Sequence, residues 1–256
     1  MPICKLCLKE KELRKSHIVP LFMQKDYFDS AQGHFLQHSE VGKLVDNALN
    51  GSVENLKEKK LVQRKVDGIY DLNILCGTCE QIIGDYETYA AGSHFLDLSI
   101  ECEYFKKEDK TLTISGLDYA KYKLFYLSIL WRMSITTQPA FQYVDLGKKY
   151  NEVLRKMIFY GNPKKYYHFP ILSSHFFNDK GFPHKLYLSP IQYDSKQYSM
   201  VHLLLNGYVH NFIVSDTIPK SKFNPSFLIR QNGCITIREM NDGDAINTAM
   251  NMQFGR

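Results

Sequence analysis

The sequence predicts an α+β fold with a metal-binding module at its N-terminus, and three observations indicate this class. Two Cys-x-x-Cys pairs lie within the first 79 residues. Apolar residues then recur at helical spacing over 118–137, and from about residue 185 they alternate as in β-strands. We expect residues 1–97 to form the metal-binding module. Residues 98–256 are expected to form an α+β domain, with a β-hairpin sheet and packed helices, that regulates the module or binds a partner.

Composition and charge restrict the classes of protein. The chain has 256 residues, of which 44% are hydrophobic and 13% aromatic, and this is enough for a packed core. The longest apolar candidate for a membrane helix, residues 124–135, is too short and contains Arg132, so no membrane association is expected. A net charge of +5 is compatible with a nucleic-acid partner. We expect a cytoplasmic protein, because the N-terminus lacks the apolar segment of a secretion signal.

The first module is predicted from residue types along the chain. Residues 13–21 read as an extended segment, in which Pro20 would stop any helix. Residues 29–65 are polar and read as a solvated insertion. After Cys79, apolar residues at helical spacing predict a helix that starts near this cysteine: Ile82, Ile83, Tyr86, Tyr89 and Ala90.

The second region begins with helices and continues with strands. Asp118 is a candidate N-cap for the helix over 118–137, and a second helix is predicted over 144–160. Strands are predicted over residues 185–193, 200–205, 208–214 and 235–239, with Asn206-Gly207 as a hairpin turn, and a short helix over 244–252. The aromatic residues of 166–169 and 176–177 fit a core better than a surface on which nucleic-acid bases stack, and a surface for a protein partner is the third possibility.

The cysteine spacing predicts one structural zinc site. Two residues between the members of a pair allow both sulfurs to reach one metal, and two such pairs supply a tetrahedral set. The expected zinc ligands are Cys4, Cys7, Cys76 and Cys79. A four-thiolate zinc has no open coordination position, so it would stabilise the fold and not catalyse. The alternatives are coincidence or redox-active thiols. Cys102 and Cys234 are expected to be core residues.

Two motifs resemble the zinc-bearing branch of the HNH endonucleases. The order is Cys-x-x-Cys, then Ser16-His17-Ile18-Val19-Pro20, then Asn73-Ile74-Leu75-Cys76-Gly77-Thr78-Cys79 followed by a helix. The segment from Ile74 to Glu80, with Tyr86-Glu87, is similar to HNH-like proteins associated with bacterial defence against phage. The resemblance covers about residues 1–95. It implies a ββα-metal, treble-clef-like fold for the module.

The resemblance also implies roles for individual residues. His17 would be the general base that activates water, since an imidazole titrates near neutral pH. Asn73 would orient this histidine, and the nearby basic residues Lys11, Arg14 and Lys15 would hold phosphate. Hydrolysis would also need a divalent cation, Mg²⁺ or Mn²⁺. The alternative for His17 is a structural histidine beside the zinc, or a substitute zinc ligand.

The chain departs from the family pattern at the residues that would bind this divalent cation. The family commonly has Asp or His before the catalytic histidine, whereas this chain has Ser16, a poor ligand. Glu80 and Glu87 are seven residues apart and would share a helix face that excludes Asp85, so they are the candidate ligands. The alternative is that Glu80 is a favourable first-turn acid and Glu87 a solvated charge or a structural ion-pair partner.

The expected function is therefore a metal-dependent HNH-type nuclease that hydrolyses phosphodiester bonds in DNA, or in RNA, as an effector of phage defence. A protein partner or a homo-oligomer would control its activity. The alternative is a catalytically inactive zinc module that binds nucleic acid or a protein partner, and Ser16 is the feature that favours it.

Overall fold

The computed structural model describes most of the chain. The described residues are 1–24, 34–36, 68–92, 102–103, 111–176, 186–196, 198–205, 208–216 and 224–240. The predicted insertion lies almost entirely outside these residues, as do the predicted helix over 244–252 and the predicted boundary after residue 97. None of the helices in the described part is long and apolar enough to cross a membrane.

The N-terminal module is a two-stranded sheet followed directly by a helix. Strand β1 (Leu13–His17) pairs antiparallel with β3 (Tyr70–Cys76), and helix α3 (Gly77–Ala90) begins at the next residue. Leu13 lies opposite Cys76, and His17 lies opposite Tyr70. Between these pairs the register shifts, so that β3 contains two more residues than β1 over the same length. The strand and the helix predicted here are confirmed.

The structure around Pro20 differs in one detail from the extended segment predicted from the sequence. The extended segment predicted over 13–21 ends as a strand at His17, and residues 21–24 are helical. Proline is compatible with the first turn of a helix, where its missing N–H is not needed for an intrahelical hydrogen bond. Pro20 therefore precedes a helix, and its carbonyl accepts the N–H of Met23 at 3.1 Å.

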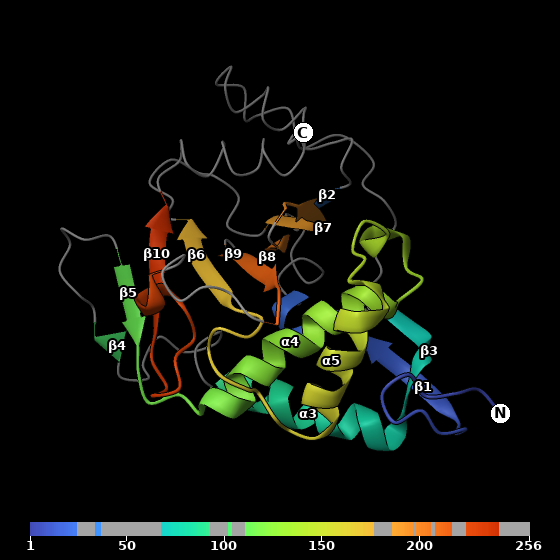
Figure 1. The fold of residues 1–256 in the computed structure, drawn as a ribbon. Coiled ribbons are helices and arrows are strands. Elements are labelled where there is room, and N and C mark those ends of the chain that lie inside the picture. The colour runs from blue at the N-terminus through green and yellow to red at the C-terminus, as the bar shows by residue number, and fades with distance from the viewer. Residues whose placement is uncertain are drawn as a thin grey trace.

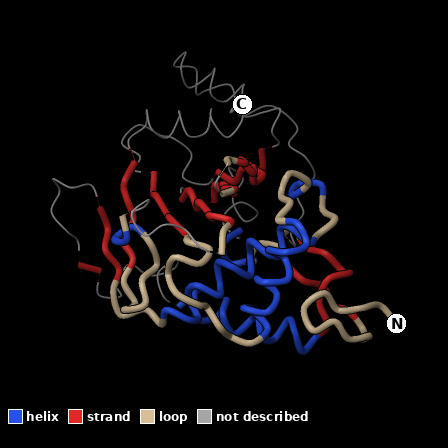
Figure 2. The backbone as a smooth tube through the Cα atoms, in the orientation of Figure 1, coloured by secondary structure: helices blue, strands red, loops and turns tan. Residues whose placement is uncertain are grey.

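Two helices cover the module on the side of the larger domain. Helix α4 (Tyr119–Ile135) begins after Asp118, whose side chain accepts the N–H of Lys121, so the predicted N-cap is confirmed. The short 3₁₀ helix η3 (Pro139–Phe141) and helix α5 (Gly147–Phe159) follow. Figure 2 shows the helices gathered between the large sheet and the small N-terminal sheet.

The large sheet has eight strands among the described residues, in the order β2-β7-β8-β9-β6-β10-β5-β4. Most neighbours are antiparallel, but β2–β7 and β6–β10 are parallel. Leu205 of β8 lies opposite Tyr208 of β9, as a two-residue hairpin loop requires, although the loop residues themselves are not described. The strands and the 3₁₀ helix η4 have these bounds: β2 His34–Leu36, β4 Cys102–Glu103, β5 Thr111–Ile114, β6 Ile171–Phe176, β7 Leu186–Asp194, β8 Ser199–Leu205, β9 Tyr208–Val214, η4 Pro225–Phe227 and β10 Ile235–Met240.

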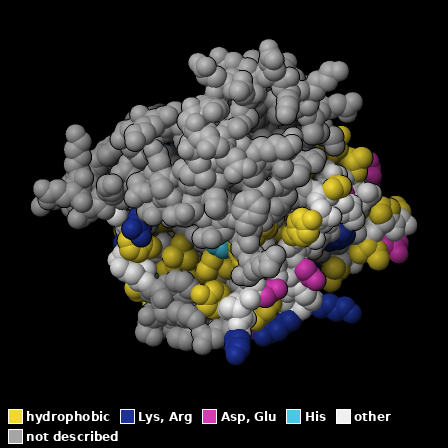
Figure 3. Space-filling model, turned by 90° about the horizontal axis from the view of Figure 1, so that it is seen from above, with side chains coloured by type: hydrophobic (Ala, Val, Ile, Leu, Met, Phe, Trp, Pro, Cys, Tyr) yellow, Lys and Arg dark blue, Asp and Glu magenta, His cyan; other side chains and the backbone are white. Residues whose placement is uncertain are grey.

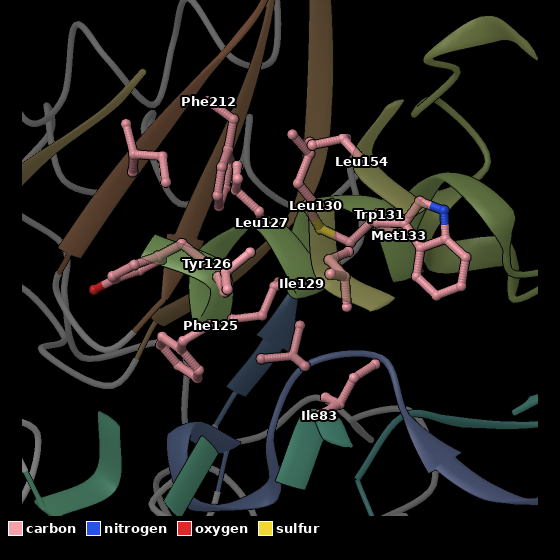
Figure 4. Close-up of a cluster of buried hydrophobic side chains, with 14 of the residues drawn as sticks. Ile83, Phe125, Tyr126, Leu127, Ile129, Leu130, Trp131, Met133, Leu154 and Phe212 are labelled. Atoms are coloured by element: carbon pink, nitrogen blue, oxygen red, sulfur yellow. The ribbon is translucent and has the colours of Figure 1, made fainter. Parts of the chain in front are cut away.

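Helix α4 is the centre of the core. Every residue from Tyr122 to Met133 is buried, which is typical of a helix surrounded by protein on all sides. The Tyr126 ring lies 6.4 Å from the ring of Phe212 on β9, while α3 and α5 pack against other sides of α4. Figures 1 and 4 show this arrangement, with α4 between the strands of the large sheet and α3. The chain is therefore α+β, and one apolar core joins the module to the C-terminal region.

Candidate metal centre and hydrolytic site

The four predicted zinc ligands come together in the structure. The sulfur atoms of Cys4, Cys7, Cys76 and Cys79 all lie within 4.8 Å of one another, and the Cys7 and Cys76 sulfurs are 4.0 Å apart. A tetrahedral zinc with bonds of about 2.3 Å separates its sulfurs by about 3.8 Å. The cluster therefore has the composition and size of a four-thiolate metal site, and it is the one such group among the described residues.

Local backbone structure places these sulfurs. The Cys4 carbonyl accepts the N–H of Leu8, which has a left-handed conformation with φ of 59°, so residues 4–8 form a tight knuckle. The Lys5 N–H donates to the Ile74 carbonyl at 2.9 Å, which joins the knuckle to β3. The Cys76 N–H points at the Cys4 sulfur at 3.3 Å. Such a contact stabilises a thiolate, as in a metal site.

The four neighbouring thiols can all lose their protons only when a cation compensates the negative charges. Burial and the neighbouring cysteines raise the pKa of Cys79 well above its ordinary value in the absence of a metal. A bound zinc reverses this effect, because its charge stabilises the thiolates and releases their protons. The donor set thus fits zinc, the cofactor predicted from the spacing.

His17 lies at the end of β1 with its side chain on the outer face of the hairpin. Its imidazole contacts the Tyr70 ring edge-on at a centroid distance of 6.3 Å. Lys15, two residues earlier on the same face, places its Nζ 4.3 Å from the centre of the same ring. His17 is only partly buried, whereas the next two residues, Ile18 and Val19, are in the core. The predicted general base therefore has a basic and aromatic surface beside it.

The inner face of the same strand is polar and buried. Ser16 is fully buried, and its register partner Asp71 is 3% exposed. Burial would raise the pKa of Asp71, but hydrogen bonds from Asn73, Thr136 and Thr137 bring it below its ordinary value. The Ser16 hydroxyl faces Glu80 on α3. Burial raises the pKa of Glu80, whereas Ser16 and Arg132 lower it again.

Glu87 already has a cationic partner. Its Oε1 lies 2.7 Å from Nη2 of Arg132 on α4, whose side chain is completely buried. Glu80 and Glu87 thus face the same guanidinium, as their shared helix face predicts. A divalent cation bound to this oxygen would need the position that the guanidinium occupies. The ion pair with Arg132 therefore does not fit Oε1 of Glu87 as a ligand of a divalent cation.

The other predicted residues of the module lie at its surface. Asn73 is exposed and lies in the irregular part of β3, where its N–H donates to Asp71. Arg14 and Lys15 are exposed and Lys11 is partly buried, so all three reach the surface of the module.

Cys234 is half-buried at a turn and is not a fully buried core residue, which corrects the prediction. Phe169 is buried, as expected, whereas Tyr166 and Tyr167 are partly exposed. The side chain of Cys102 lies outside the described part.

Sequence reasoning missed how much of the site comes from α4 and the three residues that follow it. Arg132 donates to the His17 carbonyl at 2.5 Å, and Lys5 donates to the Ile135 carbonyl at the end of the helix. Thr136 donates to Asp71 at 2.8 Å, and Gln138 donates to the Tyr70 carbonyl at 2.7 Å. A charged residue within an apolar helix, as Arg132 is, was the one signal available, because such a residue is buried only with partners.

Comparisons with protein-family models, with curated proteins and with solved structures find no match for this chain.

Proposed function

We propose that this chain is an HNH-type nuclease that hydrolyses phosphodiester bonds in DNA. A structural zinc on the four cysteines would hold the hairpin β1–β3 and α3 as a ββα-metal, treble-clef-like module. The observation that carries the proposal is the position of His17. It ends the first strand of a strand–strand–helix unit whose strands and helix meet at the four-cysteine cluster.

In this proposal His17 is the general base. Its imidazole takes the proton of the water that attacks phosphorus, and the ring is accessible because His17 is only partly buried. The Arg132 contact to the His17 carbonyl fixes the backbone of the strand end. Lys15 and Arg14, both exposed, supply positive charge for the phosphates on either side of the scissile bond.

Positive charge elsewhere on the molecule supports a polyanionic substrate. Residues 118–169 contain nine Lys and Arg against three Asp and Glu, and seven of the nine remain when the buried Lys123 and Arg132 are left out. Among these, Lys148, Lys164 and Lys165 are exposed. Figure 3 shows Lys and Arg side chains along one edge of the described surface. DNA binding by phosphate contacts is favoured by such a surface, and it weakens with added salt.

Nicking of a supercoiled plasmid by the purified full-length chain tests the proposal, with Mg²⁺ or Mn²⁺ added because the family resemblance implies one of them. His17→Ala should lower the rate by roughly 10² to 10⁴, the usual contribution of a general base. The matched control is His175→Ala, because His175 lies on β6 of the large sheet. Zinc content should be equal in all three proteins. Undiminished cleavage by His17→Ala would exclude His17 as the base.

A second candidate function is a zinc module that binds nucleic acid or a protein partner without catalysis. Ser16 in place of a metal ligand favours it, as does the Arg132 guanidinium on Glu87. It predicts that the wild-type chain binds a DNA fragment in a gel-shift assay, or binds a protein partner, but does not cleave DNA with any divalent cation added.

The role in phage defence, and the control by a partner protein or by a second copy, belong to both candidate functions. Plaque counts on bacteria with and without the gene test this role.

A further inference from the structure

Arg132 is a buried charge with an unusually complete set of partners. Its side chain is 0% exposed, in the last turn of a helix whose residues from Tyr122 to Met133 are all buried. Nε donates to the Ser128 carbonyl at 3.2 Å, Nη1 to the His17 carbonyl at 2.5 Å, and Nη2 to the Ser128 hydroxyl at 3.3 Å. Nη2 also forms the ion pair with Glu87 at 2.7 Å. Contacts on three sides fix the planar guanidinium in one orientation.

The guanidinium connects three elements that are far apart in the sequence. Ser128 is on its own helix α4, His17 ends β1, and Glu87 is in the third turn of α3. The backbone of the proposed general base and the acidic face of α3 are thus held by one side chain from the C-terminal region. The hydroxyl of Ser16 and one oxygen of Glu80, Oε2, are buried beside this group, and Ser16 and Arg132 both lower the pKa of Glu80.

Charge determines what else can bind there. A divalent cation binds carboxylate oxygens at about 2.0 to 2.6 Å. One of the two Glu87 oxygens, Oε1, is already 2.7 Å from a guanidinium nitrogen. Two cations at one carboxylate oxygen in a buried setting repel each other strongly, because the interior screens charge poorly. Arginine and a divalent cation are therefore alternative partners of Oε1 of Glu87.

We propose that Arg132 is a positioning residue that holds the strand end at His17 and, by occupying Glu87, excludes divalent cations from that carboxylate. The first half of this statement rests on the proposed nuclease function, whereas the exclusion of cations does not. A divalent cation used in hydrolysis would then be held without Glu87. The C-terminal region would be part of the site, because α4 supplies the residue that completes it.

Binding of Mn²⁺ to the zinc-loaded full-length protein, measured by electron paramagnetic resonance, tests the exclusion. Arg132→Gln should bind Mn²⁺ roughly tenfold more tightly than the wild type, the scale of effects around metal ligands. Adding Glu87→Gln to that variant should remove the gain. Glu87→Gln alone should leave the weak binding of the wild type unchanged. Circular dichroism and zinc content establish that each variant is folded.

Two results would overturn the inference. One is wild-type binding of Mn²⁺ that Glu87→Gln weakens, since Glu87 would then be a metal ligand despite Arg132. The other is a folded Arg132→Gln protein that gains no affinity for Mn²⁺. If Arg132→Gln does not fold, Arg132→Met replaces it. The methionine removes the charge but keeps a long side chain in the core, so it should also bind Mn²⁺ more tightly, and no gain would count against the inference.

The positioning role has its own measurement. In the plasmid assay, Arg132→Lys should lower kcat while KM and zinc content stay the same, because the variant disturbs the strand end at His17 and not the binding of DNA. An unchanged kcat contradicts the positioning role. If the wild type cleaves no DNA at all, the nuclease proposal fails, but the Mn²⁺ measurement still decides the exclusion of cations.

Discussion

The two regions of the molecule are stabilised in different ways. The module that contains β1, β3 and α3 has only a two-stranded sheet, and its four cysteines meet at one point. The C-terminal region instead surrounds α4, which is buried along most of its length, with a large sheet and a second helix. A two-stranded sheet is at best marginally stable alone in water, so we expect the module to depend on a metal at the four cysteines and on the contacts of α4.

This difference explains where the candidate chemistry lies. The module presents its polar residues on two faces of β1: His17 on the outer face, and Ser16 on the inner face with Glu80 and Asp71. The outer face reaches the surface, whereas the inner face is covered by the end of α4. A metal can thus stabilise a hairpin at the surface, while the large core next to it determines which of its polar groups stay accessible.

The largest expected effect is the loss of the metal. Cys76→Ser should remove one zinc ligand and expose the backbone of β1 and β3, because structural zinc contributes about 10 kcal/mol or more to the folding of small modules. Hydrogen exchange would show lost protection in these strands, with β8 and β9 still protected. Cys234→Ser, which alters a half-buried cysteine outside the cluster, is the matched control. Equal protection of β1 in both variants would mean that zinc does not stabilise the module.

A smaller effect is expected from the apolar core. Phe212→Ala should lower the free energy of unfolding by about 3 to 5 kcal/mol, because it leaves a cavity beside Tyr126. Tyr143→Ala, at a residue that is 56% exposed, should change it by less than about 0.5 kcal/mol. Denaturation by urea measures both. Similar losses for the two variants would contradict the description of α4 and β9 as the stabilising core.

The smallest effect depends on pH in the large sheet. Burial lowers the pKa of His202 to about 4, although a hydrogen bond with Asn211 acts in the opposite direction. In the unfolded chain His202 is protonated below about pH 6.5, whereas in the folded chain it is protonated only below about pH 4. The free energy of unfolding therefore falls as the pH is lowered between these values. His202→Gln should reduce this fall by about 2 to 3 kcal/mol between pH 7 and pH 4.5. Urea unfolding at both pH values measures it, and an unchanged pH dependence would contradict the cause given.

Short-range patterns in the sequence predicted much of the fold. The N-cap at Asp118, the helix at Cys79 and the antiparallel pairing of Leu205 with Tyr208 each depend on neighbouring residues, and the structure confirms them. Cysteine spacing similarly predicted the cluster, because few arrangements bring two such pairs to one point. The bulge in β3 and the order of the large sheet depend on pairing between distant segments, which no local pattern encodes.

The candidate site was harder to predict for the same reason. Glu87 has the same local sequence whether its partner is a metal, water or an arginine, and its partner Arg132 comes from a helix 45 residues later in the chain. Helical spacing placed Glu80 and Glu87 on one face, but only the packing of α4 determines what faces them. The position of His17 on the outer face likewise depends on the register of β1 with β3.

The central claim is that the four cysteines bind one zinc that joins the knuckle, β3 and α3. Elemental analysis of the freshly purified full-length chain, followed by replacement of the metal with Co²⁺, tests it most directly. We predict one zinc per chain and, with Co²⁺, the absorption of a tetrahedral four-thiolate site, with both lost in Cys7→Ser. A wild-type chain without zinc, or a Cys7→Ser chain that keeps the same Co²⁺ spectrum, would contradict the claim.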